Sequence, residues 1–149
     1  MKETYVRNAI LLEWLDGDTC RVFVDQGFDQ WTKQVVRVYG INCPELHSKN
    51  PVERDDGLRA YHYACQIFPR NSAIVIKSYK ATGAATMEKY GRWLAEIQTP
   101  NGTDFAQAML NANLARPYFG EKRQPWIPLP DKVPPVPDSH GGTAGEVES

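Results

Sequence analysis

Residues 35–45 read VVRVYGINCPE, a β-branched and aromatic run that ends in a glycine, a polar pair, a proline and a glutamate. Such a composition favours a strand, and the glycine favours a turn at its end. Arg37 lies inside this strand between Val36 and Val38, where a guanidinium group weakens sheet packing unless it has a partner. The partner could be a neighbouring acid, in an ordinary salt bridge, or a bound anion.

The segments before this strand predict two more strands. Residues 5–15 form an apolar-rich run, and residues 19–24, TCRVFV, alternate apolar and polar side chains as a half-buried strand does. Between them, residues 15–18 read LDGD and contain the Asp-Gly pair that is a strong signal for a hairpin turn. The polar stretch at residues 25–33, DQGFDQWTK, predicts a second hairpin that leads into the strand with Arg37.

The segments after it predict a helix between two groups of strands. Residues 42–56 form a polar loop, and residues 57–68 repeat apolar side chains at helical spacing. Residues 73–79 and 92–99 are typical of strands, with a loop at 81–91 between them. With the second helix described next, this order predicts an α+β fold: a five-stranded, OB-fold-like antiparallel β-barrel with two to three packed helices.

The C-terminal part divides into a helix and a tail. Thr103 is a suitable N-cap for a second helix, which Asn113 can end in the left-handed conformation. Six of the 11 prolines lie in residues 125–137. We therefore expect one domain over residues 1–119 and a proline-rich tail over residues 120–149 that is disordered or extended. The tail would serve as a spacer, and the alternative is that it binds an SH3-like partner.

Composition and charge restrict the possible functions. The 149 residues carry a net charge of −1, so bulk positive charge does not bind this chain to nucleic acid, and a few well-placed cations would have to. The three cysteines show no paired spacing, which argues against a disulfide framework or a zinc site. No signal peptide or membrane span is evident near the N-terminus. We expect a cytoplasmic monomer that does not contact a membrane.

Charged residues gather where the predicted strands end. Asp18 follows the turn that Asp16 serves, Glu45 lies in a polar loop, and Arg92 opens a strand. Each has an ordinary explanation alone, as a turn residue or a solvated charge. Together with Arg37 they supply what phosphoryl transfer needs: planar cations for phosphate oxygens, carboxylates for a hard divalent ion, and a carboxylate that positions or deprotonates water.

The order of several motifs adds a resemblance. WLDGDTCRV, VRVYGINCPE, the glycine and alanine of DDGLRAYHYA, EKYGRWLAEI and NANLARPY follow one another over residues 9–118. This pattern resembles the staphylococcal nuclease (thermonuclease) family, and R-x4-[DN]-x-P-E between DGDT and YGR is its most specific part. The resemblance implies an OB-fold barrel and a Ca²⁺-dependent phosphodiesterase that cuts DNA and RNA, preferably single-stranded, at the P–O5′ bond and leaves 3′-phosphates.

The same resemblance implies roles for residues that contact the phosphates. Arg37 and Arg92 look like the arginines that hold the phosphate, and Glu45 looks like the residue that orients or activates the attacking water. Lys89 and Tyr90 resemble the family's contacts to a terminal phosphate.

The resemblance also implies a metal site and one further substrate contact. Asp18 looks like the carboxylate ligand of Ca²⁺, and Asn42 and the backbone carbonyl of Cys43 look like the remaining protein ligands. Thr19 would contact these ligands without binding the ion itself. Tyr118 resembles a tyrosine that stacks on a base or binds a phosphate.

Two departures from the family pattern bear on function. Asn42 stands where the family usually has an aspartate, and the lost negative charge predicts a Ca²⁺ dissociation constant on the order of 10⁻⁴ to 10⁻³ M. The hairpin before Arg37 carries Phe28 and Trp31, which either cover the barrel mouth or stack on bases of a single strand. The alternative to a nuclease is a nuclease-like module that binds nucleic acid or a protein without cutting; an adaptor acting through the tail has only composition in its favour.

Overall fold

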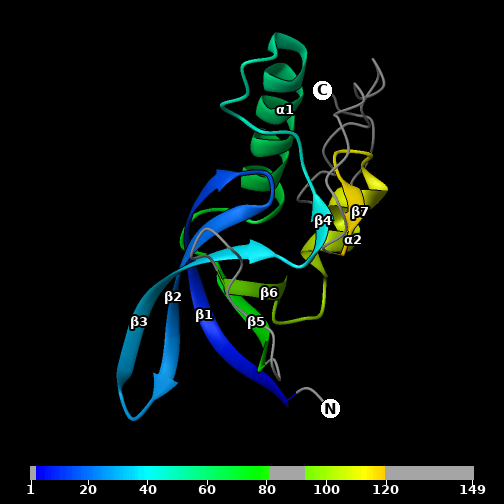
Figure 1. Ribbon diagram of the computed structural model, residues 1–149. Helices are drawn as coiled ribbons and strands as arrows, with labels where there is room; N and C mark the ends of the chain where they lie inside the picture. Colours follow the sequence, from blue (N-terminus) through cyan, green and yellow to red (C-terminus); the bar gives the residue numbers. More distant parts are fainter. Residues whose placement is uncertain (1–2, 81–92, 120–149) are drawn as a thin grey trace.

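The computed structural model describes residues 3–80 and 93–119 (Figure 1). In chain order the elements are β1 (Glu3–Asp16), β2 (Thr19–Gly27), β3 (Gln30–Val38), β4 (Gly40–Asn42), α1 (Pro51–Ile67), β5 (Ala73–Lys80), β6 (Trp93–Gln98), α2 (Phe105–Asn111) and β7 (Arg116–Tyr118). The expected proline-rich tail, residues 120–149, lies outside the described residues.

Five strands close into a barrel in the order β1-β2-β3-β6-β5. The pairings of β1 with β2, β2 with β3, β1 with β5 and β5 with β6 are antiparallel, whereas β3 and β6 pair in parallel with Val36 opposite Trp93. The predicted α+β, OB-fold-like, five-stranded barrel is confirmed, but the prediction that it is antiparallel is wrong at one pair, because β3 and β6 run parallel and the sheet is mixed. No short turn joins β3 to β6, so their relative direction is not restricted to that of a hairpin.

The core fills one end of the barrel and extends under the helices. Trp14 of β1 stacks on Phe105 of α2 with ring centroids 4.3 Å apart, and its indole N–H donates to the carbonyl of Phe68 at 3.0 Å. Phe105 also packs edge-on against Phe68. All three aromatic residues are buried, so they fix both helices against the end of the barrel where β1 turns into β2.

Helix α1 begins earlier than the apolar spacing predicts, and the predicted start near Gly57 is wrong. Asn50 is the N-cap, and its side chain accepts hydrogen bonds from the N–H groups of Val52 and Glu53 at 2.9 and 3.4 Å. Pro51 occupies the first turn, where its missing N–H costs nothing. In the first turns Arg54 and Asp55 are exposed and no apolar period appears, so the sequence signal for this part of the helix lies in its cap. Among the described residues, no helix is long and apolar enough to cross a membrane.

Helix α2 is capped by Asp104, whose carboxylate accepts from the N–H of Gln107 at 2.9 Å, so the predicted cap at Thr103 is one residue early. Asn113 has a φ of 61° and follows the helix in the left-handed conformation, as predicted. The chain then turns back toward the end of β3.

A second, two-stranded sheet was not predicted. In it β4 and β7 pair antiparallel, with Gly40 opposite Tyr118 and Asn42 opposite Arg116. Gly40 has a φ of 93°, which favours glycine, and a Cβ there would lie 3.4 Å from the ring of Phe119. This small sheet brings the end of the described chain beside the segment that follows β3 (Figure 1).

Candidate functional site

Arg37 is held at the end of β3 by three oxygen atoms. Its Nη2 lies 3.5 Å from Oδ2 of Asp18 and donates to Oδ1 of Asn42 at 3.2 Å, and its Nη1 donates to the carbonyl of Val38 at 3.3 Å. Its side chain retains 11% exposure. The sequence left open whether the partner of Arg37 is a neighbouring acid or a bound anion. The structure shows that it pairs with an acid, Asp18, which is itself one of the predicted site residues.

Asp18 joins the turn after β1 to the segment after β4. Its Oδ1 accepts from the hydroxyl of Thr19 at 3.1 Å, and its Oδ2 accepts from the N–H of Cys43 at 2.9 Å. Asp16 instead serves the turn, because its Oδ1 accepts from the N–H of Asp18 at 3.1 Å. Two acids two residues apart therefore have different tasks, and only Asp18 reaches Arg37.

Tyr118 lies against the same guanidinium group. The Cζ of Arg37 is 5.4 Å from the centroid of the Tyr118 ring, within the range of a cation–π contact. The pairing of β4 with β7 also places Arg116 opposite Asn42. Arg116 is a further cation beside the site that sequence reasoning missed, because nothing in the sequence indicates that these two short strands pair.

Glu45 is exposed in the loop between β4 and α1, and α1 holds this loop in place. The backbone N–H of Glu45 donates to Oε2 of Glu53 at 3.1 Å, and the hydroxyl of Ser48 donates to Oε1 of the same carboxylate at 3.0 Å. A Cβ on Gly57 would lie 2.6 Å from the carbonyl oxygen of Glu45. Sequence reasoning missed Glu53 and this role of Gly57, although a glycine inside a helix often marks such a close approach.

Helix α1 also contacts the turn that carries Asp18. A Cβ on Gly17 would lie 2.8 Å from Cβ of Ala60 and 3.1 Å from Sγ of Cys43. Only a glycine permits this packing. One helix therefore sets the positions of both predicted carboxylates, Asp18 through the turn and Glu45 through the loop.

The buried thiols near the site are not nucleophiles. Burial raises the pKa of the Cys43 thiol well above its ordinary value, and the charges of Asp18 and Asp16 raise it further, against a smaller lowering by Arg37. Burial and the same two aspartates also raise the pKa of Cys20. Both thiols therefore stay protonated at neutral pH.

The predicted metal ligands are hard oxygen donors of the type that Ca²⁺ prefers, but they carry a single negative charge, that of Asp18. The amide oxygen of Asn42 faces the guanidinium of Arg37. Within residues 3–80 and 93–119, no group of three or more His, Cys, Asp or Glu could hold a metal ion. The donor set is of a kind that suits a hard cation, and its low charge is the reason for which weak binding is expected.

Three predicted substrate contacts, Lys89, Tyr90 and Arg92, lie outside the described residues. The structure brings together Arg37, Asp18, Thr19, Asn42, Cys43 and Tyr118. Glu45 follows Cys43 by two residues, with its backbone held by α1.

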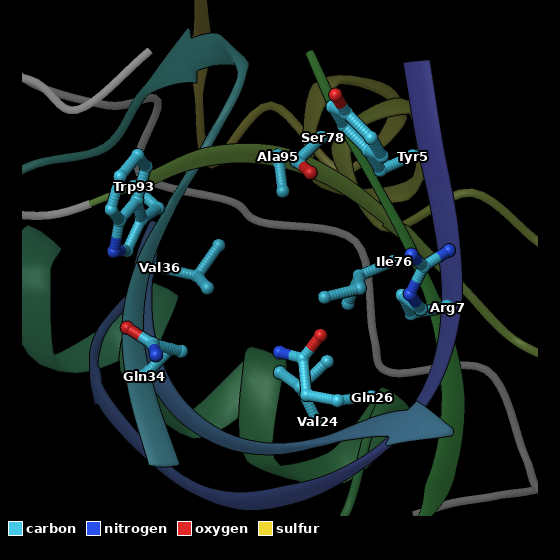
Figure 2. A pocket seen from close by; sticks show the side chains of 10 residues that line it. All are labelled: Tyr5, Arg7, Val24, Gln26, Gln34, Val36, Ile76, Ser78, Trp93 and Ala95. Carbon is cyan, nitrogen blue, oxygen red and sulfur yellow. The ribbon is translucent and has the colours of Figure 1, made fainter. Parts of the chain in front are cut away.

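A separate hollow of about 350 Å³ lies inside the barrel (Figure 2). Gln34 and Val36 of β3 line it, so the alternation of side chains along the strand places Arg37 on the opposite face. Val24, Val36 and Ile76 form apolar walls, and Gln26 and Gln34 are among its polar lining side chains. The described residues that line it include Arg7 but no acid. The hollow thus differs from the site at Arg37 in both position and chemistry.

The fold and the site define a class: a closed OB-fold-like barrel whose outer wall carries an arginine held by a carboxylate and a tyrosine. The sequence profile of the family described as staphylococcal nuclease homologue matches residues 35–126, more than half of the chain. The protein belongs to the staphylococcal nuclease homologue family and is a nuclease-type or nuclease-like module. A search of the curated proteins found no match.

Proposed function

We propose that the protein is a Ca²⁺-dependent nuclease that hydrolyses phosphodiester bonds of DNA and RNA, preferably single-stranded, with little regard to base sequence. The observation that carries this proposal is the arrangement of Arg37, which is held by Asp18 and Asn42 next to the loop of Glu45. A guanidinium held in advance can stabilise charge on a phosphoryl group without reorganising during the reaction. Contacts to phosphate carry no base information, which supports weak sequence preference.

In the proposed reaction, N–H groups of Arg37 donate to the non-bridging phosphate oxygens, and Arg92 is assigned the same task by resemblance. Glu45, whose side chain is exposed, accepts a proton from water as the water oxygen bonds to phosphorus. The P–O5′ bond breaks, O5′ takes up a proton, and the phosphate stays on the 3′ side. Lys89, Tyr90 and Tyr118 are assigned to the neighbouring substrate groups.

Asp18, Asn42 and the carbonyl of Cys43 would hold Ca²⁺, and Thr19 would orient the Asp18 carboxylate. Bound Ca²⁺ would neutralise charge on the phosphoryl oxygens. We propose further that the protein acts as a cytoplasmic monomer and that low resting calcium restrains it there. Cleavage of host DNA at sub-micromolar Ca²⁺ would contradict this restraint.

The test compares wild type with Glu45→Gln on single-stranded DNA and on RNA, across a Ca²⁺ titration with an EDTA arm. Asp55→Asn is the matched control, because Asp55 is an exposed acid on α1. Glu45→Gln should lower kcat by roughly 10² to 10⁴-fold, as expected for loss of a general base. EDTA should abolish cutting, and Asp55→Asn should cut as wild type does.

The second candidate function is a module that binds nucleic acid without cutting it. One observation favours it: Asn42 stands where the family usually has an anionic ligand, and its amide oxygen accepts a hydrogen bond from Arg37. Binding of single strands without cleavage at any Ca²⁺ concentration would support this candidate and exclude the nuclease.

A further inference from the structure

The outer face of the β2–β3 hairpin continues directly from the site. Side chains alternate along a strand, and the buried residues Cys20, Val22 and Val36 face the barrel interior. Cross-strand pairing then defines the opposite face. The positions on this outer face are Thr19, Arg21, Phe23 and Asp25 on β2 and Trp31, Lys33, Val35 and Arg37 on β3.

This face combines cations with aromatic rings. Lys33 is exposed, pairs opposite Phe23 and lies four residues before Arg37 on the same strand. The rings of Phe23 and Trp31 stack with centroids 5.2 Å apart, and Trp31 remains 40% exposed. Arg21 also lies on this face, in an ion pair with Glu13.

The tip of the hairpin presents another aromatic ring. Phe28 is 98% exposed, with a φ of 55°, and Asp29 follows with a φ of 60°. A tight hairpin turn has left-handed conformations at both of its central residues. Asn or Gly adopts this conformation with less strain than Phe does. On the inner face, Gln26 donates to Thr32 at 3.0 Å and helps to hold the two strands together. The hairpin extends beyond the barrel (Figure 1).

We propose that a single strand of nucleic acid runs from Arg37 along the outer face of β2–β3 toward the hairpin tip. Lys33 contacts a phosphate, and the Phe23–Trp31 pair and Phe28 stack on bases. Cationic side chains interspersed with aromatic rings are the chemistry by which proteins bind single strands without reading sequence. Arg21 and Arg37 on this face are ion-paired with acids, so Lys33 and the aromatic rings carry most of the contact, as the near-neutral charge of the chain requires.

The inference rests on the proposed function in one respect, the placing of the reacting phosphate at Arg37. Arg37 and Trp31 are six residues apart on one strand, which corresponds to about 20 Å. At about 3.4 Å per stacked nucleotide, roughly six nucleotides cover that distance, and fewer do so if the strand is stretched. A dinucleotide therefore reaches only one end of the face.

The experiment measures binding in the Glu45→Gln background with EDTA present, by fluorescence anisotropy of labelled dT2, dT12 and a 12-base-pair duplex. Trp31→Ala should weaken dT12 binding roughly fivefold or more, and Trp31→Phe should restore it. Lys33→Ala should reduce the slope of log K against log salt by about 0.7. Leu58→Ala and Arg70→Ala, exposed positions away from the hairpin, should match the background protein.

Because Trp31 also packs on Phe23, Phe28→Ala is the second variant; its ring is almost fully exposed, so its removal should not change the melting temperature. The proposal is overturned if Trp31→Ala and Phe28→Ala both bind dT12 as the background does, or if the duplex binds as tightly as dT12. If wild type does not cut but binding still depends on Trp31, the nuclease proposal fails and this one stands. If wild type cuts and the hairpin variants bind dT12 as the background protein does, the nuclease proposal stands and this one fails.

Discussion

Arg37 has a structural task beside its proposed chemical one, because it neutralises the buried carboxylate of Asp18. Arg37→Ala should therefore lose stability, by about 3 kcal/mol or more, as well as activity. Arg37→Lys keeps the positive charge but not the planar, two-pronged donor geometry, so kcat should fall at least 100-fold with the melting temperature nearly unchanged. Paired denaturation and single-turnover measurements check this; equal activity of the lysine variant would mean that charge alone suffices.

Asn42 limits the metal site that we propose. Asn42→Asp adds a second carboxylate next to Asp18 and should tighten Ca²⁺ binding at least tenfold, since the charge of the ligands sets affinity at such sites. Isothermal titration calorimetry without substrate is the direct measurement, with Asn111→Asp, an exposed position on α2, as control. An unchanged affinity would mean that the cation binds elsewhere or that the new carboxylate pairs with Arg37 and does not bind the cation.

The three cysteines differ in accessibility. Cys20 and Cys43 are buried with raised pKa values, while Cys65 on α1 is only partly buried. At pH 8 a disulfide reagent should modify one thiol per native chain, and all three after unfolding. Cys65→Ser should remove the fast phase, and rapid reaction of a second thiol in native protein would contradict the described packing.

Among the elements, α1 has the largest influence on the site because it contacts both carboxylate-bearing segments. Gly57→Ala would stabilise helix α1 by about 1 kcal/mol through intrinsic helix propensity. The Cβ of the new alanine would, however, collide with the carbonyl of Glu45. We expect kcat to fall tenfold or more while α1 remains helical by circular dichroism. Leu58→Ala, one residue further on and exposed, is the control. Full activity of Gly57→Ala would show that the loop adjusts freely.

The elements also show how far the sequence could be interpreted. Strands with alternating side chains and a short turn between them, such as β1 and β2, were predicted because the signal is local. The start of α1 was missed because its first turns have no apolar period, although Asn50 and Pro51 carry capping signals. The pairing of β4 with β7 was missed because the three-residue strands are far apart in the chain and carry too few residues for a pattern.

The site was predictable in part for the same reason. Arg37 and Asp18 were grouped as charges at the ends of predicted strands, and the family resemblance added Asn42. The structure brings these three residues together. The residues that position Glu45 were not predicted, because a hydrogen bond from the backbone N–H of Glu45 to the carboxylate of Glu53, eight residues later, leaves no trace in sequence spacing. Sequence indicates which groups carry the chemistry better than it indicates which groups hold them in place.

For the whole molecule, the extent of the folded domain can be tested. The described core runs from Ala9 to Ala115, and the family match ends at residue 126. A chain ending at 126 keeps every buried residue of the described core, so we expect it to melt within about 2 °C of the full chain. Scanning calorimetry of both chains is the measurement, and a large drop would assign residues 127–149 a part in stability.

The parallel pairing that closes the barrel also has a consequence for the order of events during synthesis. β3 ends at residue 38 and its partner β6 begins at residue 93, so the ribosome must make more than fifty further residues before the wall can be completed. Until then one edge of β3 is unpaired, and such edges are where nascent chains associate with one another. The growing chain thus passes through an interval when it is vulnerable to aggregation, and a chaperone that covers β3 would act in that interval.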